Sequence, residues 1–172
     1  VVEEWRLVAE RAREHEEVVG TAPYIRAEGM LSHGGQVNGT MIRGILPGRE
    51  AQVSEVSDKM IAGELKALEP GEFGIVLGRD LARILGAGPG DKVTLITPTA
   101  NVSPVGVLPR MKRFRVVGIF EVGMYEYDSA LALIHIDDAK RLFKTGEGVT
   151  GVRLKLEDMF RAPWVTRDLA DA

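Results

Sequence analysis

The segment 97–113, TPTANVSPVGVLPRMKR, constrains the fold more than any other part of this sequence. It lies between two strand-like runs, KVTLI and FRVVGIF, and it contains the prolines Pro98, Pro104 and Pro109. Proline has no N–H donor and a fixed φ, so we do not expect this segment to form an interior strand. It is also longer than a tight hairpin turn, and loops of this length in compact domains are commonly functional.

The same segment is rich in apolar side chains, which normally lie inside a protein: Val102, Val105, Val107, Leu108 and Met111. The flanking strands could pair and carry the segment outward by ~20 Å, if about seven residues run out and seven return at ~3.3 Å each. Alternatively, the apolar side chains fold back onto their own domain. A projecting loop stiffened by proline would lose little entropy on docking, which suits insertion into a partner's groove. The residues alone leave both conformations open.

The rest of the chain predicts an α+β fold with mixed strands. Apolar periodicity and turn residues predict helices over 2–18, 57–68, 79–88, 137–146 and 162–170, the second interrupted by Gly63. They predict strands over 24–32, 40–46, 73–78, 92–96, 114–122, 130–136 and 149–158, the first two joined at Gly34 and Gly35 as a hairpin. We expect LPGREAQ to end the hairpin, MYEYDS to be irregular, and Leu81, Ile84 and Leu85 to point inward.

The order of these elements suggests two lobes in one chain of 172 residues. Residues 1–46 and 145–172 would form an outer lobe, and residues 47–144 an inserted β-rich lobe. No run approaches the roughly 18 apolar residues of a membrane helix. Because both ends read as helices cut short, we expect a soluble domain excised from a longer protein.

The charged and titratable residues do not form a recognisable catalytic or metal site. Lys and Arg total 22 and Asp and Glu total 25, a net charge of −3, which disfavours a nucleic-acid partner. The chain has no cysteine, and His15, His33 and His135 lack metal-ligand spacing. GAGPGDK precedes a strand, unlike a phosphate loop, so we predict a helix stop at Gly86 or Gly88 and then a tight turn. We expect no cofactor and no metal.

Two further clusters have alternative interpretations. Glu126 and Asp128 alternate along MYEYDS and could form a carboxylate pair for acid–base chemistry, although packing or an interface better explains this segment. Arg110, Arg113 and Arg115, with Lys112, could bind nucleic acid, form a solvated strand entrance, or guide a protein partner.

Longer stretches carry a resemblance to a known family. FGIVLGRDLARILGAGPGDKVTLITPT, SPVGVLPRMKRFRVVGIFEVGMYEYDSALALI and the upstream YIRAEGMLSHGGQVNGTMIRGI resemble the periplasmic domain of lipoprotein-releasing ABC transporter permeases of the LolC/LolE type. LGRDLARILG followed by GDKV also suits the broader MacB-like permease group. The resemblance covers nearly the whole chain.

The resemblance implies a fold and a function. The outer lobe would be porter-like, and the inserted β-rich lobe would carry a projecting β-hairpin loop. The domain would be periplasmic, on an inner-membrane permease of a Gram-negative bacterium. The transporter would extract lipoproteins with a second permease subunit, using ATP hydrolysed by a separate cytoplasmic subunit, so this chain would not be an enzyme.

In such LolC-type domains the hairpin, called the hook, binds the periplasmic lipoprotein chaperone LolA. The hook would correspond to residues 97–112. Its expected partner-binding residues are Thr97, Pro98, Val102, Ser103, Pro104, Val105, Gly106, Val107, Leu108, Pro109, Arg110 and Met111, and a neighbouring patch would include Arg113 and Arg115. The alternatives are a mechanotransmission domain of a MacB-like permease with a different periplasmic partner, and an enzyme built around MYEYDS.

Overall fold

The computed structural model describes residues 6–7, 18–53, 56–103, 106–143 and 151–156. Residues 18–21, 52–53, 98–103, 106–109 and 151–156 are described by their backbone alone. The helices predicted over 2–18 and 162–170 lie almost wholly outside these ranges. Within them, no helix combines the length and the apolar character needed to cross a membrane.

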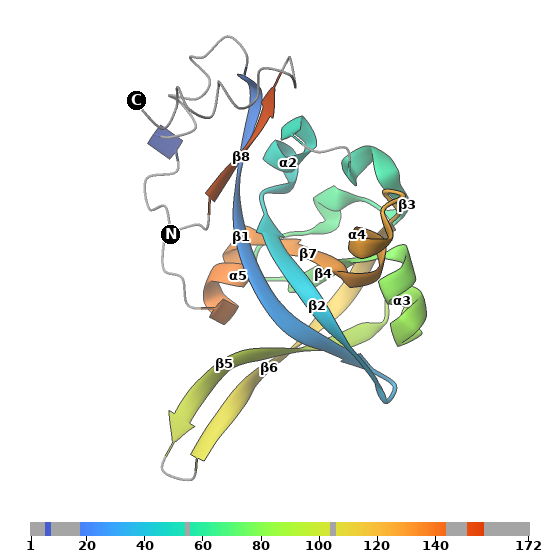
Figure 1. Cartoon of the computed structure of the whole chain (residues 1–172), viewed down its shortest axis with the longest axis vertical. Helices are drawn as coiled ribbons and strands as arrows, with labels where there is room; N and C mark the ends of the chain where they lie inside the picture. Colours follow the sequence, from blue (N-terminus) through green and yellow to red (C-terminus); the bar gives the residue numbers. More distant parts are fainter. Residues whose placement is uncertain (1–5, 8–17, 54–55, 104–105, 144–150, 157–172) are drawn as a thin grey trace.

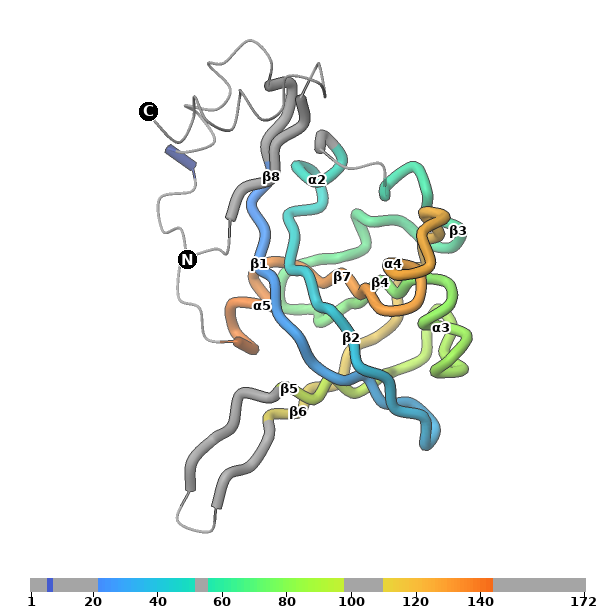
Figure 2. The backbone as a smooth tube through the Cα atoms, viewed as in Figure 1, coloured from blue at the N-terminus to red at the C-terminus, as the bar shows by residue number. Residues whose placement is uncertain are grey.

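The predicted first hairpin is present and longer than expected. β1 (Val18–His33) pairs antiparallel with β2 (Gln36–Ile45), and the two strands curve side by side along the molecule (Figure 2). Gly34 and Gly35 connect them with φ of 55° and 86°, a left-handed backbone that glycine adopts without steric cost. Period-two alternation then buries one face of the pair.

The strands form a ring. β4 (Gly74–Gly78), β5 (Lys92–Ser103), β6 (Gly106–Phe120) and β7 (Leu131–His135) follow the order β2-β7-β4-β6-β5-β1. Because β2 also pairs with β1, these six strands close on themselves. β8 (Gly151–Leu156) pairs with the first part of β1, and the short β3 (Met60–Gly63) pairs with the end of β6 (Figure 1).

Two apolar cores fill the described part of the molecule. One joins the ring strands to the helices α3 (Arg79–Leu85) and α5 (Ile136–Phe143). The other lies under the short 3₁₀ helices η1 (Val56–Lys59) and η2 (Leu65–Ala67) and reaches Phe120 and Leu133. The helices α2 (Pro47–Val53) and α4 (Tyr125–Ala130) complete the described elements.

Several local predictions were incomplete or wrong. LPGREAQ ends the hairpin after Ile45, as predicted, but it also contains the unpredicted helix α2, which Pro47 opens because proline's fixed φ suits the first helical position. The predicted helix over 57–68 is instead η1, β3 and η2, with Gly63 at φ 67° opposite Gly118. MYEYDS contains α4 and is not irregular. Ile84, predicted inward, is 40% exposed.

The fold class is α+β, as predicted, with most of the described chain in strands. Strands from both predicted lobes share the one sheet, since β2 pairs with β7 and β1 with β5. The division at residues 46 and 144 stays a prediction.

Candidate functional site

The segment predicted to be functional forms paired strands. β5 and β6 stay antiparallel from Lys92, opposite Arg115, to Ser103, opposite Gly106. β1 pairs with β5 only up to Ile96, so among the described residues the strands beyond Thr97 pair with each other alone. We call residues 98–103 and 106–109 the arm, which runs on past β1 in Figure 1. Pro98 and Pro109 therefore do not prevent extended structure here.

The positions of two prolines explain how the ladder tolerates them. The register shifts between Thr97 and Ala100, which places Pro98 in an irregularity, and Pro109 lies opposite Ala100. A residue that cannot donate an N–H is accepted at a bulge or on an edge strand, where its missing hydrogen bond costs little.

The base of the arm is attached to the body of the domain. Thr97 is 1% exposed. A guanidinium nitrogen of Arg110, Nη1, donates a hydrogen bond to the backbone oxygen of Leu142 at 3.0 Å. Leu142 is the penultimate residue of α5, so this bond joins the start of the arm to the last turn of that helix.

An apolar row crosses the outward face of the sheet beside the arm. Met30 lies opposite Ile96, which lies opposite Met111, and Met30 and Met111 are 45% and 64% exposed. Strand alternation places the exposed Arg113 and Arg115 on the same face as Met111. The face thus combines accessible apolar side chains with two cations, a composition suited to a protein partner.

Sequence reasoning missed Met30 and Ile96 as members of this face. Alternation along the strand predicted over 24–32 places Leu31 and Met30 on opposite faces. The pairing of β1 with β5 brings Met30 to the arm, and an alternation pattern carries no information on which strands pair.

Lys112 lies on the opposite face from Met111 and Arg113. Its Nζ is 4.2 Å from the centroid of the Phe73 ring, which in turn meets the buried Phe114 ring edge-on at 5.5 Å. The cation–π contact holds the Lys112 side chain beside the start of β4.

The structure describes the side chains of only some of the predicted partner-binding residues. Arg110 is half-buried and Met111 exposed. Pro104 and Val105 lie outside the described residues. Only the backbone is described for Pro98, Val102, Ser103, Gly106, Val107, Leu108 and Pro109. Their role in binding stays a prediction, as does the choice between projection and folding back of their side chains.

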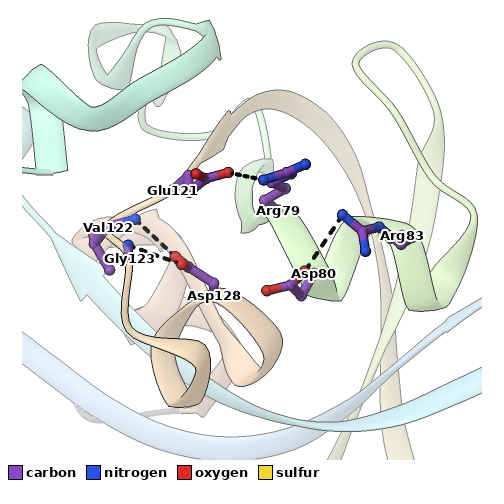
Figure 3. A network of polar contacts seen from close by, with 7 residues as sticks. All are labelled: Arg79, Asp80, Arg83, Glu121, Val122, Gly123 and Asp128. Atoms are coloured by element: carbon purple, nitrogen blue, oxygen red, sulfur yellow. Dashed lines mark hydrogen bonds and ion pairs between the residues drawn. The ribbon is translucent and has the colours of Figure 1, made fainter.

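The carboxylates of MYEYDS do not form a pair. Asp128 is buried, and its two oxygens accept hydrogen bonds from the backbone nitrogens of Val122 at 2.8 Å and Gly123 at 3.0 Å (Figure 3). Glu126 is exposed. Residues two apart on a helix face different directions, so one carboxylate holds a loop while the other meets solvent.

The ion pairs near Asp128 also lie at the surface. Arg79 bonds Glu121 at the end of β6, and Arg83 lies 3.7 Å from Asp80 within α3 (Figure 3). A neighbouring cavity of about 300 Å³ is lined by Val122, Met124 and Tyr127 but by neither carboxylate of MYEYDS. This arrangement gives no support to acid–base chemistry at this segment.

The other sequence candidates have structural roles. Gly86 ends α3 in the left-handed region, as predicted, and the backbone nitrogen of Asp91 closes the following turn on Gly88 at 3.0 Å. Burial lowers the pKa of His135, whose Nδ1 accepts a hydrogen bond from the backbone nitrogen of Asp137. The described residues include no group of three side chains able to hold a metal ion.

Comparison with known proteins identifies relatives of the whole chain. Residues 2–172 match the family model described as the MacB-like periplasmic core domain. The chain is 45% identical over 166 residues to the lipoprotein-releasing system transmembrane protein LolC of Neisseria meningitidis, covering 96% of this chain. It is 43% identical over 167 residues to the protein of the same name from Xylella fastidiosa, covering 97% of this chain. It spans about 40% of the length of each relative.

A solved structure has the same fold. The periplasmic region of MacB from Actinobacillus actinomycetemcomitans matches 96% of this chain and 71% of its own, with a TM-score of 0.62 and 15% sequence identity. At that identity the likeness concerns the fold alone.

Proposed function

The chain belongs to the family of MacB-like periplasmic core domains, with a sequence of the LolC/LolE type, and from this we propose its function. It is the periplasmic domain of an inner-membrane ABC transporter permease that releases lipoproteins, and it recruits the periplasmic chaperone LolA through the hook, residues 97–112. Lipoproteins are the cargo, and a second permease subunit and a cytoplasmic ATPase complete the transporter. The observation that carries this proposal is 45% identity to a LolC protein over 96% of the chain.

The ladder between β5 and β6 supports the assignment of the hook. Its backbone pairs run to Ser103 and Gly106, and beyond Thr97 the described part of the sheet supplies no third strand. A two-stranded ribbon has side chains on both faces, and the valines and leucine of the hook would suit insertion into a lipid-binding cavity of a chaperone. Met111 and the exposed Arg113 and Arg115 would then contact the rim of that cavity.

The experiment is a titration of the chain with purified LolA by isothermal calorimetry. Val105→Asp and Leu108→Asp should each weaken binding about tenfold or more, because a carboxylate would be desolvated in an apolar cavity. Val37→Asp is the matched control: Val37 is 49% exposed on β2 and outside the hook, so affinity should not change.

A second variant removes the hook while keeping the base. Because Ala100 lies opposite Pro109, residues 101–108 can be replaced by an Asn-Gly turn that closes the shortened hairpin. Unchanged affinity in this variant, with the wild-type circular dichroism spectrum, would refute the hook assignment.

The alternative is mechanotransmission to a different periplasmic partner, as in a MacB-like permease. The likeness to the MacB periplasmic region concerns the fold, so it does not separate the two functions. Cross-linking of the full transporter in cells separates them, since capture of an adaptor protein and no chaperone would favour the alternative.

A further inference from the structure

The cavity of about 300 Å³ beside α4 is separate from the hook. None of the described residues that line it comes from β5, and from β6 it takes only Phe120, the last residue of that strand. It lies on the side of the second apolar core, between α4 and the short helices α2 and η1, and α4 and the arm occupy separate regions of the molecule (Figure 1). Its volume is at the lower end of the range of cavities that hold small molecules.

The floor of the cavity is apolar and belongs to the sheet. Leu133 lies opposite Arg43 of β2, and Leu131, two residues earlier on β7, points to the same face. Leu131 and Leu133 are 6% and 2% exposed, and Phe120 is fully buried beside them. The apolar part of a ligand would gain most by lying against this floor, where it leaves water.

One wall of the cavity is rigidly placed. A Cβ on Gly78 would collide with the backbone oxygen of Asp128, so the glycine lets α4 approach β4 directly. The carboxylate of Asp128 accepts hydrogen bonds from the backbone nitrogens of Val122 and Gly123, which holds the loop before α4 (Figure 3). Met124 follows in that loop, lines the cavity and is 53% exposed, so it lies at the opening.

Three charged side chains line the cavity: Arg43, Glu50 and Lys59. Glu50 is 1% exposed in α2, whereas Lys59 is exposed, and its backbone oxygen accepts a hydrogen bond from the nitrogen of Glu121 at 3.0 Å. The side chain of Glu121 bonds Arg79 and does not line the cavity (Figure 3). Two cations against one carboxylate make the charge of the described lining positive.

We infer that this cavity binds a small amphipathic carboxylate, whose charged end meets Arg43 and Lys59 and whose apolar tail lies against Leu131. The charge of the lining selects an anion over a cation, and a guanidinium suits a carboxylate because it can donate two parallel hydrogen bonds. At roughly 30 Å³ for each water-sized group, the cavity admits about ten heavy atoms, the size of octanoate. This binding does not rest on the proposed function, because the hook takes no part in it.

The probe is sodium octanoate, titrated into the 15N-labelled 172-residue chain and followed by two-dimensional NMR. The amide signals of Lys59, Val122, Met124 and Tyr127 should shift saturably, with a dissociation constant of about 1 mM for a ligand of this size. Shifts that do not saturate, or that fall mainly on other residues, would overturn the inference.

Two analogues of the probe separate its charge from its tail. Acetate has the charge without the tail, and 1-octanol has the tail without the charge, so each should bind at least fivefold more weakly than octanoate. Octanol binding as tightly as octanoate would overturn the role of the cations. Acetate binding as tightly would overturn the role of the apolar floor.

Charge reversal tests the position of the carboxylate. Lys59→Glu should weaken octanoate binding about fivefold or more, because an attracting charge becomes a repelling one. Lys66→Glu is the matched control: Lys66 is an exposed lysine of η2 that does not line the cavity, and its reversal changes the net charge equally. Equal losses in the two variants would overturn the site, since only the overall charge of the chain would then matter.

Truncation at the opening tests the position of the tail. Met124→Ala removes part of the apolar wall and should weaken octanoate binding about threefold. Tyr125→Ala is the control, because Tyr125 is the next residue, is 71% exposed and does not line the cavity, so the affinity should not change. Equal affinities of the two variants would overturn the placement of the ligand beside this loop.

Discussion

The strands β5 and β6 are built differently at their two ends. In the base, Val93 lies opposite Phe114, both at most 1% exposed, and β1 and β4 flank the pair. In the arm, the described backbone of each strand pairs with the other alone. A two-stranded hairpin is marginally stable by itself, so the closed ring must fix the register that the arm continues.

The largest expected loss of stability comes from a substitution in the buried base of the β5–β6 pair. Phe114→Ala should lower the free energy of unfolding by about 3–5 kcal/mol, because it empties a core position and removes the edge-on contact with Phe73. Urea denaturation followed by circular dichroism measures it.

The matched arm variant is Leu108→Ala, which should change stability by less than about 0.5 kcal/mol if the arm is not part of the core. A cost near that of Phe114→Ala would show instead that the arm folds back onto the domain.

A smaller loss of stability is expected when the hydrogen bonds that hold the loop before β4 are weakened. Asp138→Asn should lower the free energy of unfolding by about 2 kcal/mol, since it weakens two charge-assisted hydrogen bonds from Gly71 and Phe73. Asp137→Asn is the control, because that side chain is half-exposed on the same helix. Equal losses in the two variants would contradict the assigned role of Asp138.

Breaking the link between base and arm should have a modest energetic effect. Arg110→Ala should cost about 1 kcal/mol, for the hydrogen bond to Leu142. It should also broaden the distance distribution between spin labels at positions 101 and 61, measured by pulsed electron paramagnetic resonance. An unchanged distribution would mean that the ladder alone sets the direction of the arm.

The smallest effect concerns pH. Burial lowers the pKa of His135 below 6.5, so the folded protein binds this proton less readily than the unfolded chain does. The free energy of unfolding should therefore fall as the pH drops below 6.5 and level off below the folded pKa. Urea titrations at several pH values should show that the free energy of unfolding falls less steeply with decreasing pH in His135→Gln than in the wild type. Identical pH dependence in the two proteins would contradict the role of His135.

The sequence was informative wherever the pattern of apolar residues reflects burial. Alternation located both strands of the first hairpin, and apolar runs located the strands around Ile75, Val93 and Ile134, of which the first and last are buried on both faces. The LolC-type resemblance was likewise confirmed across the whole chain.

Errors occurred where one residue type permits two structures. Proline was read only as the end of the hairpin at Pro47 and as a bar to an interior strand in the arm, yet Pro47 also starts a helix, and Pro98 and Pro109 are accepted in a bulged two-stranded ladder. The row from Met30 to Met111 depends on which strands pair, and pairing across the sheet has no local signal in the sequence.

The continuity of β6 from Gly106 to Phe120 has a mechanical consequence. A pull on the end of the arm, along the strand axis, loads the hydrogen bonds from β6 to β4 and those from β5 to β1 in shear. The bonds then share the force and must break together, whereas a sideways pull would peel them one after another. The two-stranded arm therefore resists tension along its axis and bends easily under a sideways force.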